Sequence, residues 1–308
     1  MSVTATRSGV LLITLLASLA AVAEPEPTQE QLAEYAAAVA AFEAELNYQT
    51  GQVSLPGDIA TLDLGADYRF LDAADARHLL VDGWGNPPDV GEGIVGMVLP
   101  QSSPFSDEGW GVMIRFQEEG YISDEDAGEI DYDEMLEEMQ AAVVEDSVTR
   151  EQQGYGTYRL IGWAQAPYYD AATHKLHWAK ELNFGDYPVN TLNYEVRILG
   201  RRGYLEMTAI GSMAQFQSIR DDMTAVLALT NFQDGHTYGD FDPDVDQVAG
   251  YGLAALVAGG ILTKSGLLAK IGLFLLAMKK FIIIGLVALA AGFRKFFGKK
   301  DDRPQISA

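Results

Sequence analysis

The chain has 308 residues, with 21 Lys and Arg, 44 Asp and Glu, and a formal net charge of −23. Nucleic acids and anionic lipid surfaces repel so acidic a protein, which excludes nucleic-acid binding as its function. Cysteine is absent, so the chain has neither a disulfide framework nor thiolate chemistry.

The first 23 residues have the pattern of a secretory signal. Arg7 precedes a short apolar run at residues 9–20, and Ala21-Val22-Ala23 supplies small residues at a cleavage site. A basic start, a short apolar core and a small-residue end are typical of export, the alternative being an uncleaved anchor. We therefore predict a bacterial envelope protein whose main domain lies in the periplasm.

Residues 249–300 are predicted to form a membrane anchor. They hold eight Lys and Arg residues and no acid, whereas residues 24–248 hold 11 bases and 42 acids. In the preferred topology, one helix spans the inner membrane from about residue 249 to 269, and a basic amphipathic helix lies on the cytoplasmic leaflet. In the alternative, residues 281–293 cross back as a hairpin, at about 2.5–3.5 kcal/mol for each lysine near mid-depth.

Composition divides the sequence into six predicted parts. Thr28 and Gln31 have the spacing of a capping box, so an Ala-rich helix is expected near the start of the mature chain. An acidic stretch around Pro243 separates the main domain from the anchor. The parts are a signal peptide (1–23), an N-terminal helical segment (24–50), an exported acidic domain (51–239), an acidic linker (240–248), the membrane anchor (249–300) and a tail (301–308).

Local signals predict the fold class. Asp72 is expected to begin a short helix ending near Leu80, and Asp131 a long helix ending before Gly154. A further helix is expected at residues 213–229, and residues 200–203 suit a hairpin turn. Strands are expected at residues 52–55, 60–64, 68–71, 94–99, 109–116, 158–164, 175–182, 191–199 and 204–210. The prediction is an α+β fold with a mixed, mainly antiparallel sheet and packed helices, plus C-terminal transmembrane or amphipathic helices.

Several short motifs occur in order along the chain. They are Leu46-Asn47-Tyr48-Gln49-Thr50-Gly51, Trp84-Gly85-Asn86-Pro87-Pro88, Gly109-Trp110-Gly111-Val112, Gly162-Trp163-Ala164, Tyr169-Asp170-Ala171-Ala172-Thr173-His174-Lys175-Leu176, Trp178-Ala179-Lys180-Glu181-Leu182, Leu192-Asn193-Tyr194, Leu199-Gly200-Arg201-Arg202-Gly203 and Asp240-Phe241-Asp242-Pro243. Together they resemble the bacterial family of predicted membrane-anchored proteins known as domain of unknown function 2167. The resemblance implies the topology above and no particular activity.

Two groups of residues raise the question of a metal site. His174 and His177 lie near Lys180 and Glu181, but strand residues three apart point to opposite faces, so surface histidines near a turn are expected instead. Residues 123–134 have part of the spacing of an EF-hand loop but lack its early ligands, which favours an acidic loop leading into a helix.

The acidic linker is the better cation candidate. Asp240, Asp242, Asp244 and Asp246 alternate along an extended segment and could share Ca²⁺ near the membrane surface. The competing interpretation is a plain linker in which Asp246 caps the anchor helix. Apart from this Ca²⁺ option, no cofactor is expected.

The sequence holds no nucleophile elbow, phosphate loop, dinucleotide fingerprint or zinc-protease motif. We therefore predict a non-catalytic module that binds or assembles with an envelope or membrane protein. The alternative is a membrane-tethered hydrolase acting on an envelope polymer, with catalytic acids among Asp, Glu and His174 or His177. The possible interaction residues are Trp84, Asn86, Trp110, His174, His177, Arg201 and Arg202.

Overall fold

The computed structural model describes residues 28–128, 130–185 and 187–264. The predicted signal peptide, the anchor beyond residue 264 and the tail lie outside these residues. The chain divides into two compact units, Met1–Ala258 and Gly259–Ala308. The two sheets and the first four helices belong to the first unit.

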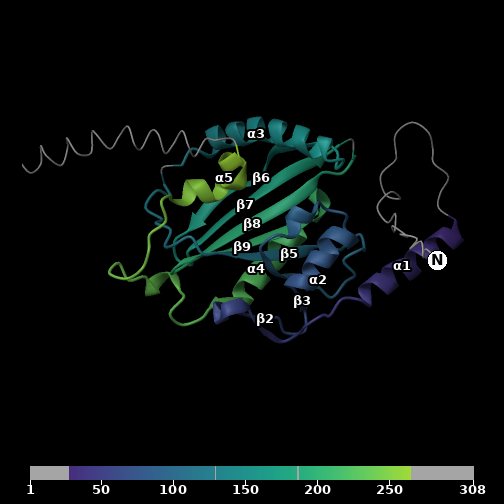
Figure 1. The fold of residues 1–308 in the computed structure, drawn as a ribbon, viewed down its shortest axis with the longest axis horizontal. Helices are drawn as coiled ribbons and strands as arrows, with labels where there is room; N and C mark the ends of the chain where they lie inside the picture. Colours follow the sequence, from purple (N-terminus) through teal and green to yellow (C-terminus); the bar gives the residue numbers. More distant parts are fainter. Residues whose placement is uncertain (1–27, 129, 186, 265–308) are drawn as a thin grey trace, which may run out of the picture. The chain divides into compact units, whose positions relative to one another are not determined.

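A seven-stranded antiparallel sheet forms the centre of the first unit (Figure 1). The strand order is β3-β4-β5-β9-β8-β7-β6, and every neighbouring pair is antiparallel. This arrangement confirms the predicted α+β class with a mainly antiparallel sheet. The strands are β3 (Tyr68–Asp72), β4 (Ile94–Pro100), β5 (Gly111–Gln117), β6 (Tyr158–Asp170), β7 (Lys175–Phe184), β8 (Thr191–Gly200) and β9 (Gly203–Ser212).

A second sheet has three short strands, in the order β1 (Gln52–Ser54), β2 (Ala60–Asp63) and β10 (Thr230–Phe232). Sequence analysis did not predict β10. The strand has only three residues, too few for the alternating pattern that marks a strand. It forms because it follows helix α4 directly and pairs with β2, which lies far earlier in the chain.

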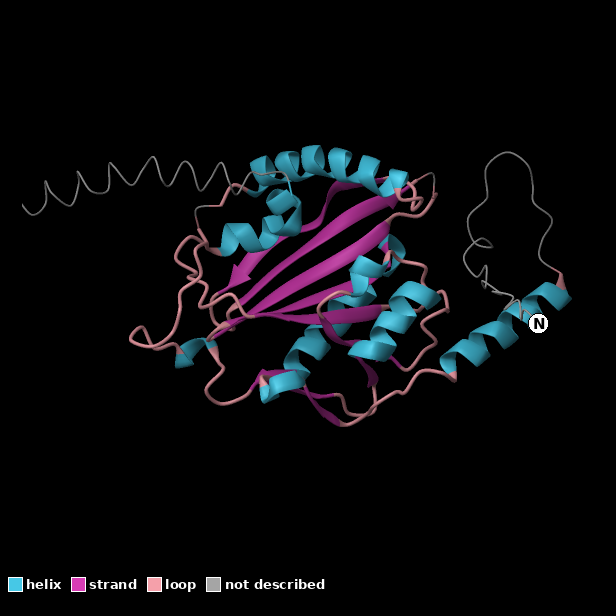
Figure 2. Ribbon diagram, viewed as in Figure 1, coloured by secondary structure: helices cyan, strands magenta, loops and turns pink. Residues whose placement is uncertain are grey.

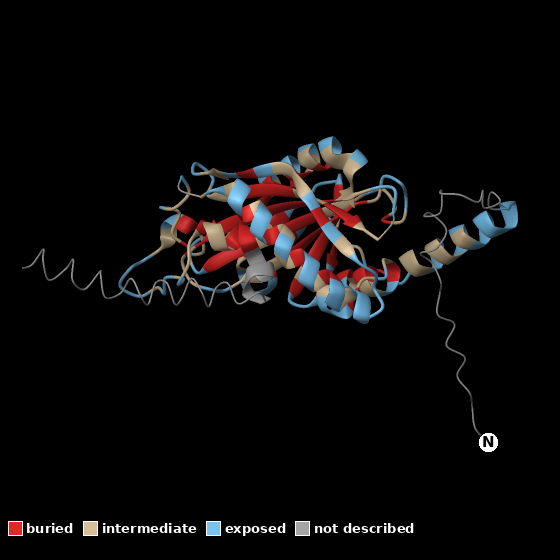
Figure 3. Cartoon of the chain, turned by 90° about the horizontal axis from the view of Figure 1, so that it is seen from above, coloured by how far each residue is buried: buried red, intermediate tan, exposed pale blue. Residues whose placement is uncertain are grey.

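Helices cover both faces of the main sheet (Figure 2). Helix α4 (Phe216–Leu229) buries Ile219 and Met223 against one face, where they meet Val196 of β8 and Met207 of β9. Helix α2 (Ala73–His78) lies on the other face, where the residues after it pack on Met97 and Leu99 of β4. The buried residues concentrate in the strands between these layers, as Figure 3 shows in red.

Helix α3 (Tyr132–Gln152) lies along β6, the edge strand of the main sheet (Figure 1). The amide of Gln140 donates to the carbonyls of Leu160 and Ile161, and the hydroxyl of Ser147 accepts from the backbone N–H of Tyr158. Open strand edges invite pairing with other chains. Because α3 forms hydrogen bonds with these backbone groups of β6, fewer of them are free to pair with a strand of another chain.

The predicted helix starts are confirmed by their caps. Thr28 and Gln31 form a reciprocal capping box at the start of α1 (Gln29–Glu43), and Asp72 and Asp131 accept backbone N–H groups at α2 and α3. Helix α2 ends at His78 rather than at Leu80, because a wider turn of π-helix takes over from Leu79 to Gly83.

Helix α5 (Leu253–Lys264) lies within the predicted anchor. It begins four residues after residue 249, where the spanning helix was expected to start. Across the part of the chain that the structure describes, no helix combines the length and the apolar character required to cross a membrane.

Candidate functional site

Three segments that are far apart in sequence meet at one end of the main sheet. They are the β6–β7 turn with His174, the β8–β9 turn with Arg201, and residues 233–258, here called the docked segment. The backbone joins them, because Leu199 donates to His174 at 2.9 Å and Arg201 donates to His236 at 3.0 Å. Three of the motifs that carry the family resemblance therefore lie together, which makes this end of the sheet the candidate site.

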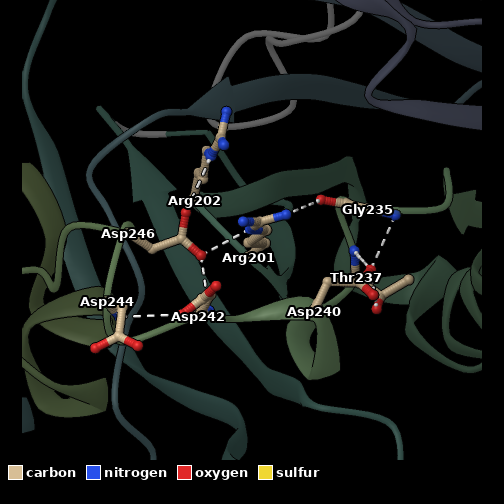
Figure 4. A network of polar contacts seen from close by, with 8 residues as sticks. All are labelled: Arg201, Arg202, Gly235, Thr237, Asp240, Asp242, Asp244 and Asp246. Carbon is tan, nitrogen blue, oxygen red and sulfur yellow. Dashed lines mark hydrogen bonds and ion pairs between the residues drawn. The ribbon is translucent and has the colours of Figure 1, made fainter.

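An arginine pair fastens the docked segment to the β8–β9 turn (Figure 4). The Nε atom of Arg201 donates to Asp246 at 2.7 Å, and Nε of Arg202 donates to the same carboxylate at 3.4 Å. The side chain of Asp246 is only 1% exposed. The hydrogen bond from Arg201 lowers the pKa of Asp246 below its ordinary value, so the carboxylate stays charged and paired.

The other aspartates of the predicted calcium site are bonded within the docked segment (Figure 4). Asp240 accepts from the backbone N–H groups of Gly235 and Thr237 and from the hydroxyl of Thr237. Asp242 accepts from the N–H of Asp244 at 3.0 Å. Among the described residues, no three His, Cys, Asp or Glu side chains are grouped to hold a metal ion. The segment is thus folded on itself rather than extended as an alternating ladder of ligands.

The loop after β5 pairs with the docked segment through its backbone. Tyr121 donates to Gln247 at 2.8 Å and accepts from Ala249 at 2.8 Å. Gly120 has a φ of +91°, and a Cβ there would lie 2.8 Å from the Gln247 carbonyl oxygen. Only glycine allows this approach without strain. Residues predicted as a linker are therefore tied to the domain on both sides of Val248.

Asp126 caps helix α5 from a distant loop. Its carboxylate accepts from the N–H groups of Leu253 and Ala254, at 3.1 and 3.4 Å. Gly252 leaves the space for this carboxylate, since a Cβ there would overlap it. The predicted cap at Asp246 is wrong, because Arg201 and Arg202 occupy that carboxylate. Asp126 performs the capping instead and belongs to the loop that resembled an EF-hand.

His174 lies in a cluster of aromatic and acidic side chains. The hydroxyl of Tyr169 donates to Asp124 at 2.7 Å and lies 3.1 Å from Nδ1 of His174. Since that hydroxyl has one hydrogen, Nδ1 is the donor in the second contact. Burial and the Asp124 carboxylate raise the pKa of Tyr169. The ring of Tyr238 lies 4.2 Å from that of His174, and the side chain of His174 is 37% exposed.

His177 does not join this cluster. It lies within β7, is 8% exposed, and stacks on Tyr168 with ring centres 4.8 Å apart. Burial, followed by the nearby Lys175, lowers the pKa of His177 to about 4. The expected surface position is therefore wrong for His177, which is buried in the sheet and has contacts separate from those of His174.

Acid should destabilise the domain through His177. The unfolded imidazole titrates near 6.5 and the folded one near 4, so its stabilising contribution is complete above pH 6.5. Between pH 6.5 and 4 the free energy of unfolding should fall by roughly 3 kcal/mol in total. Urea unfolding of the full chain at several pH values measures this loss. His177→Phe, which keeps the stacked ring, should flatten the profile, and an unchanged slope would contradict the assignment.

The tryptophans and the asparagine of the predicted interaction set have structural contacts. Trp84 donates from Nε1 to the carbonyl of Pro104 at 3.2 Å, and Asn86 donates to the carbonyl of Leu80 at 3.0 Å. Trp110 is buried in the core beside Tyr68. Of the predicted set, only His174, Arg201 and Arg202 come together at the candidate site.

Comparison with known protein families shows which family the chain belongs to. Residues 47–290 match the family described as protein of unknown function DUF2167. The chain belongs to the DUF2167 family. The resemblance predicted from the motifs is thereby confirmed. No curated protein sequence matches the chain.

Two solved structures have a similar arrangement of elements to this DUF2167 protein. Cyanobacterial PsbP from Synechocystis sp. PCC 6803 is 10% identical, with a TM-score of 0.32, covering 61% of this chain and 94% of that chain. The Ran-binding protein Mog1p of Saccharomyces cerevisiae is 13% identical, with a TM-score of 0.29, covering 60% of this chain and 95% of that chain.

Sequence reasoning missed several residues of the DUF2167 candidate site. Tyr121, Asp124 and Asp126 stand in the loop after β5, where only an acidic composition was visible. Tyr169 and Tyr238 are the other two, and Tyr169 does lie in a quoted motif. Their partners are distant in sequence, so no local spacing could have linked them.

Proposed function

We propose that this DUF2167 protein is a non-catalytic module of the bacterial envelope. In this proposal, residues 1–23 direct export and the chain after α5 anchors the module to the inner membrane. The acidic domain in the periplasm then binds or assembles with another envelope or membrane protein. One observation carries the proposal: Arg201, Arg202 and Asp126 of the candidate site fasten the docked segment.

The docked segment supports an assembly role in particular. A tether that only concentrates a domain near a membrane needs a flexible linker. Here the chain is held at Asp246, at Tyr121 and at the Asp126 cap, and Leu256 and Val257 are buried. The first compact unit therefore extends to Ala258 and does not end at Asp240. A segment held at several points suits a module that presents a defined surface to a partner.

Membrane fractionation followed by a native pulldown tests the proposal. Full-length protein should sediment with the inner membrane, and gentle solubilisation should recover a reproducible stoichiometric partner. Asp246→Asn, which removes the charge that Arg201 and Arg202 bind, should stay in the membrane but recover less than half as much partner. Asp221→Asn is the matched control, because Asp221 is exposed and its pair with Arg220 is 3.8 Å long. Recovery of the protein in the soluble periplasm, or without a partner, would refute the proposal.

A membrane-tethered hydrolase is the second candidate, and the His174 cluster favours it. His174 and Asp124 are both partly exposed and lie 3.8 Å apart, with Tyr169 between them. An imidazole oriented by a carboxylate can act as a general base. A hydrolase should release fragments from isolated envelope polymers and lose this activity in His174→Ala. If the wild type releases none, only the binding module stands.

A further inference from the structure

Helix α1 extends away from the main sheet and has little packing along its length (Figure 1). None of its residues is buried, and Leu32 is 44% exposed. Phe42, near its C-terminal end, stacks on His78 of α2 with ring centres 4.5 Å apart and meets Phe105 edge-on at 5.4 Å. The direction of α1 therefore depends on the contacts at this end of the helix.

His78, the last residue of α2, lies between two carboxylates. Its Nδ1 atom lies 2.8 Å from Asp82, in the π-helical turn that follows α2, and its Nε2 atom lies 3.3 Å from Glu45, just after α1. Phe42 covers one face of the ring and carries no charge. The imidazole thus joins the chain at the end of α1 to the turn after α2.

Both contacts of His78 fit a protonated ring. An ionised carboxylate only accepts hydrogen bonds, and a neutral imidazole has a single N–H group to donate. Two carboxylates on the two ring nitrogens therefore need both nitrogens to carry hydrogen, which is the imidazolium form. Burial of the ring lowers the pKa of His78, but the hydrogen bonds to Asp82 and Glu45 outweigh burial and raise the pKa above its ordinary value of 6.5.

The other charged side chains of α2 have different partners. Arg77 donates to the carbonyl of Pro88 at 2.7 Å. Asp75 accepts from the backbone and side-chain amides of Asn47, at 2.9 and 3.1 Å, and so ties the chain after α1 to α2 without an ion pair. At this junction His78 is therefore the group whose charge changes near neutral pH.

We propose that His78 is a pH-sensitive latch that fixes the direction of α1 relative to the domain. The protonated ring holds Asp82 and Glu45 together. When the ring loses a proton, the remaining N–H stays with Asp82, because that contact is shorter and lies within one helical turn, and Glu45 is released. Helix α1 then keeps the ring contacts of Phe42 but loses this ionic contact. The latch is separate from the docked segment and does not rest on the proposed function.

Protonation and latching favour each other, because the pKa of His78 is raised when both carboxylates are bound. The latch is therefore closed below pH 6.5 and opens as the pH rises through the pKa of the latched state. The side chains of Glu45 and Asp82 are 67% and 64% exposed, so solvent screens both pairs. The ratio of open to closed molecules should change about two- to fivefold, the range expected for exposed ion pairs.

A distance measurement between two spin labels tests the latch, since the chain has no cysteine of its own. Ala37→Cys on α1 and Ala225→Cys on α4 place the labels at exposed positions. Electron resonance of the labelled full-length protein in detergent gives the distribution of distances between them. From about pH 6 to about pH 9, a second population of distances should grow about two- to fivefold relative to the first.

Two substitutions assign the response to His78 and Glu45. His78→Gln stays polar but cannot be charged, so the distances should no longer depend on pH. Glu45→Gln removes the charge that faces Nε2, so the second population should already be enriched at pH 6 and should change little above it. Glu34→Gln, at an exposed carboxylate of α1, and His236→Gln, at an imidazole of the docked segment, are the matched controls. Both should keep the response of the wild type.

A distance distribution that is the same at pH 6 and pH 9 in the wild type overturns the proposal. A wild-type response in His78→Gln, or its loss in His236→Gln, also overturns it, because another group would then control α1. Circular dichroism verifies that each variant is folded. If His78→Gln fails to fold, Glu45→Gln decides instead, since an exposed carboxylate tolerates the change to an amide.

Discussion

Glu195→Ala should destabilise the domain by roughly 3–5 kcal/mol, one of the two largest effects expected in this protein. Glu195 lies between Lys180 and Arg197, at 2.5 and 3.2 Å, and is almost fully buried. Its removal leaves two buried cations without their shared counter-charge. Guanidinium unfolding of the full-length protein, followed by circular dichroism, measures the loss.

The pKa of Glu195 gives the same prediction a pH dependence. Burial alone would raise this pKa, but Lys180 and Arg197 outweigh burial and hold it below the ordinary value. Because the pKa of Glu195 is lower in the folded state, its carboxylate adds to the free energy of unfolding above the pKa of the unfolded chain. This stabilisation is lost as the pH falls through the pKa of the folded state. The difference between the wild type and Glu195→Ala should therefore shrink in strong acid.

Two controls separate the buried charge from the loss of side-chain volume. Asp221→Ala removes one partner of an exposed pair with Arg220, 3.8 Å apart, and should cost at most about 0.5 kcal/mol. The double variant Lys180→Met with Glu195→Leu replaces a charged pair by apolar groups and should recover much of the loss. If Glu195→Ala costs no more than the Asp221→Ala control, the ion pairs of Glu195 with Lys180 and Arg197 do not stabilise the fold.

The parts of the fold that the sequence predicts are those with local signals. The capping box at Thr28 and the caps at Asp72 and Asp131 are confirmed, since each acts on N–H groups within three residues. The hairpin turn at residues 200–203 is also confirmed, because β8 and β9 pair from Gly200 and Gly203 outward. Such contacts depend on neighbouring residues alone.

The candidate site depends on contacts between residues that are far apart in the sequence, which local sequence patterns do not predict. Alternating aspartates from Asp240 to Asp246 suggested an extended ladder of ligands. The fold instead turns this segment so that Asp246 meets Arg201, which precedes it by 45 positions. In β8, Glu195 and Arg197 alternate with apolar residues, and such alternation usually marks a solvated face. Only the packed structure shows that this face is buried.

Ending the chain after Val248 should unfold or strongly weaken the domain, whereas ending it after Lys264 should not. The shorter chain loses the Ala249 hydrogen bond to Tyr121 and the buried side chains of Leu253, Leu256 and Val257. Burial of three such side chains contributes roughly 5 kcal/mol or more to folding. Urea unfolding and amide hydrogen exchange at the Tyr121 loop compare the two chains.

Comparing these two truncated chains also tests whether residues 249–264 belong to the folded domain or serve only as a membrane anchor. If residues 249–264 served only to enter a membrane, the shorter chain would be as stable as the longer one, and protection at Tyr121 would not change. Asp126→Ala in the chain ending at Lys264 supplies an intermediate case, since loss of the α5 cap should cost about 1 kcal/mol. We expect the chain ending at Val248 to be the least stable, the Asp126→Ala variant to be intermediate, and the unchanged chain ending at Lys264 to be the most stable. This order follows only if the start of the predicted anchor is part of the folded domain. Any segment that enters the membrane would then begin beyond Ala258.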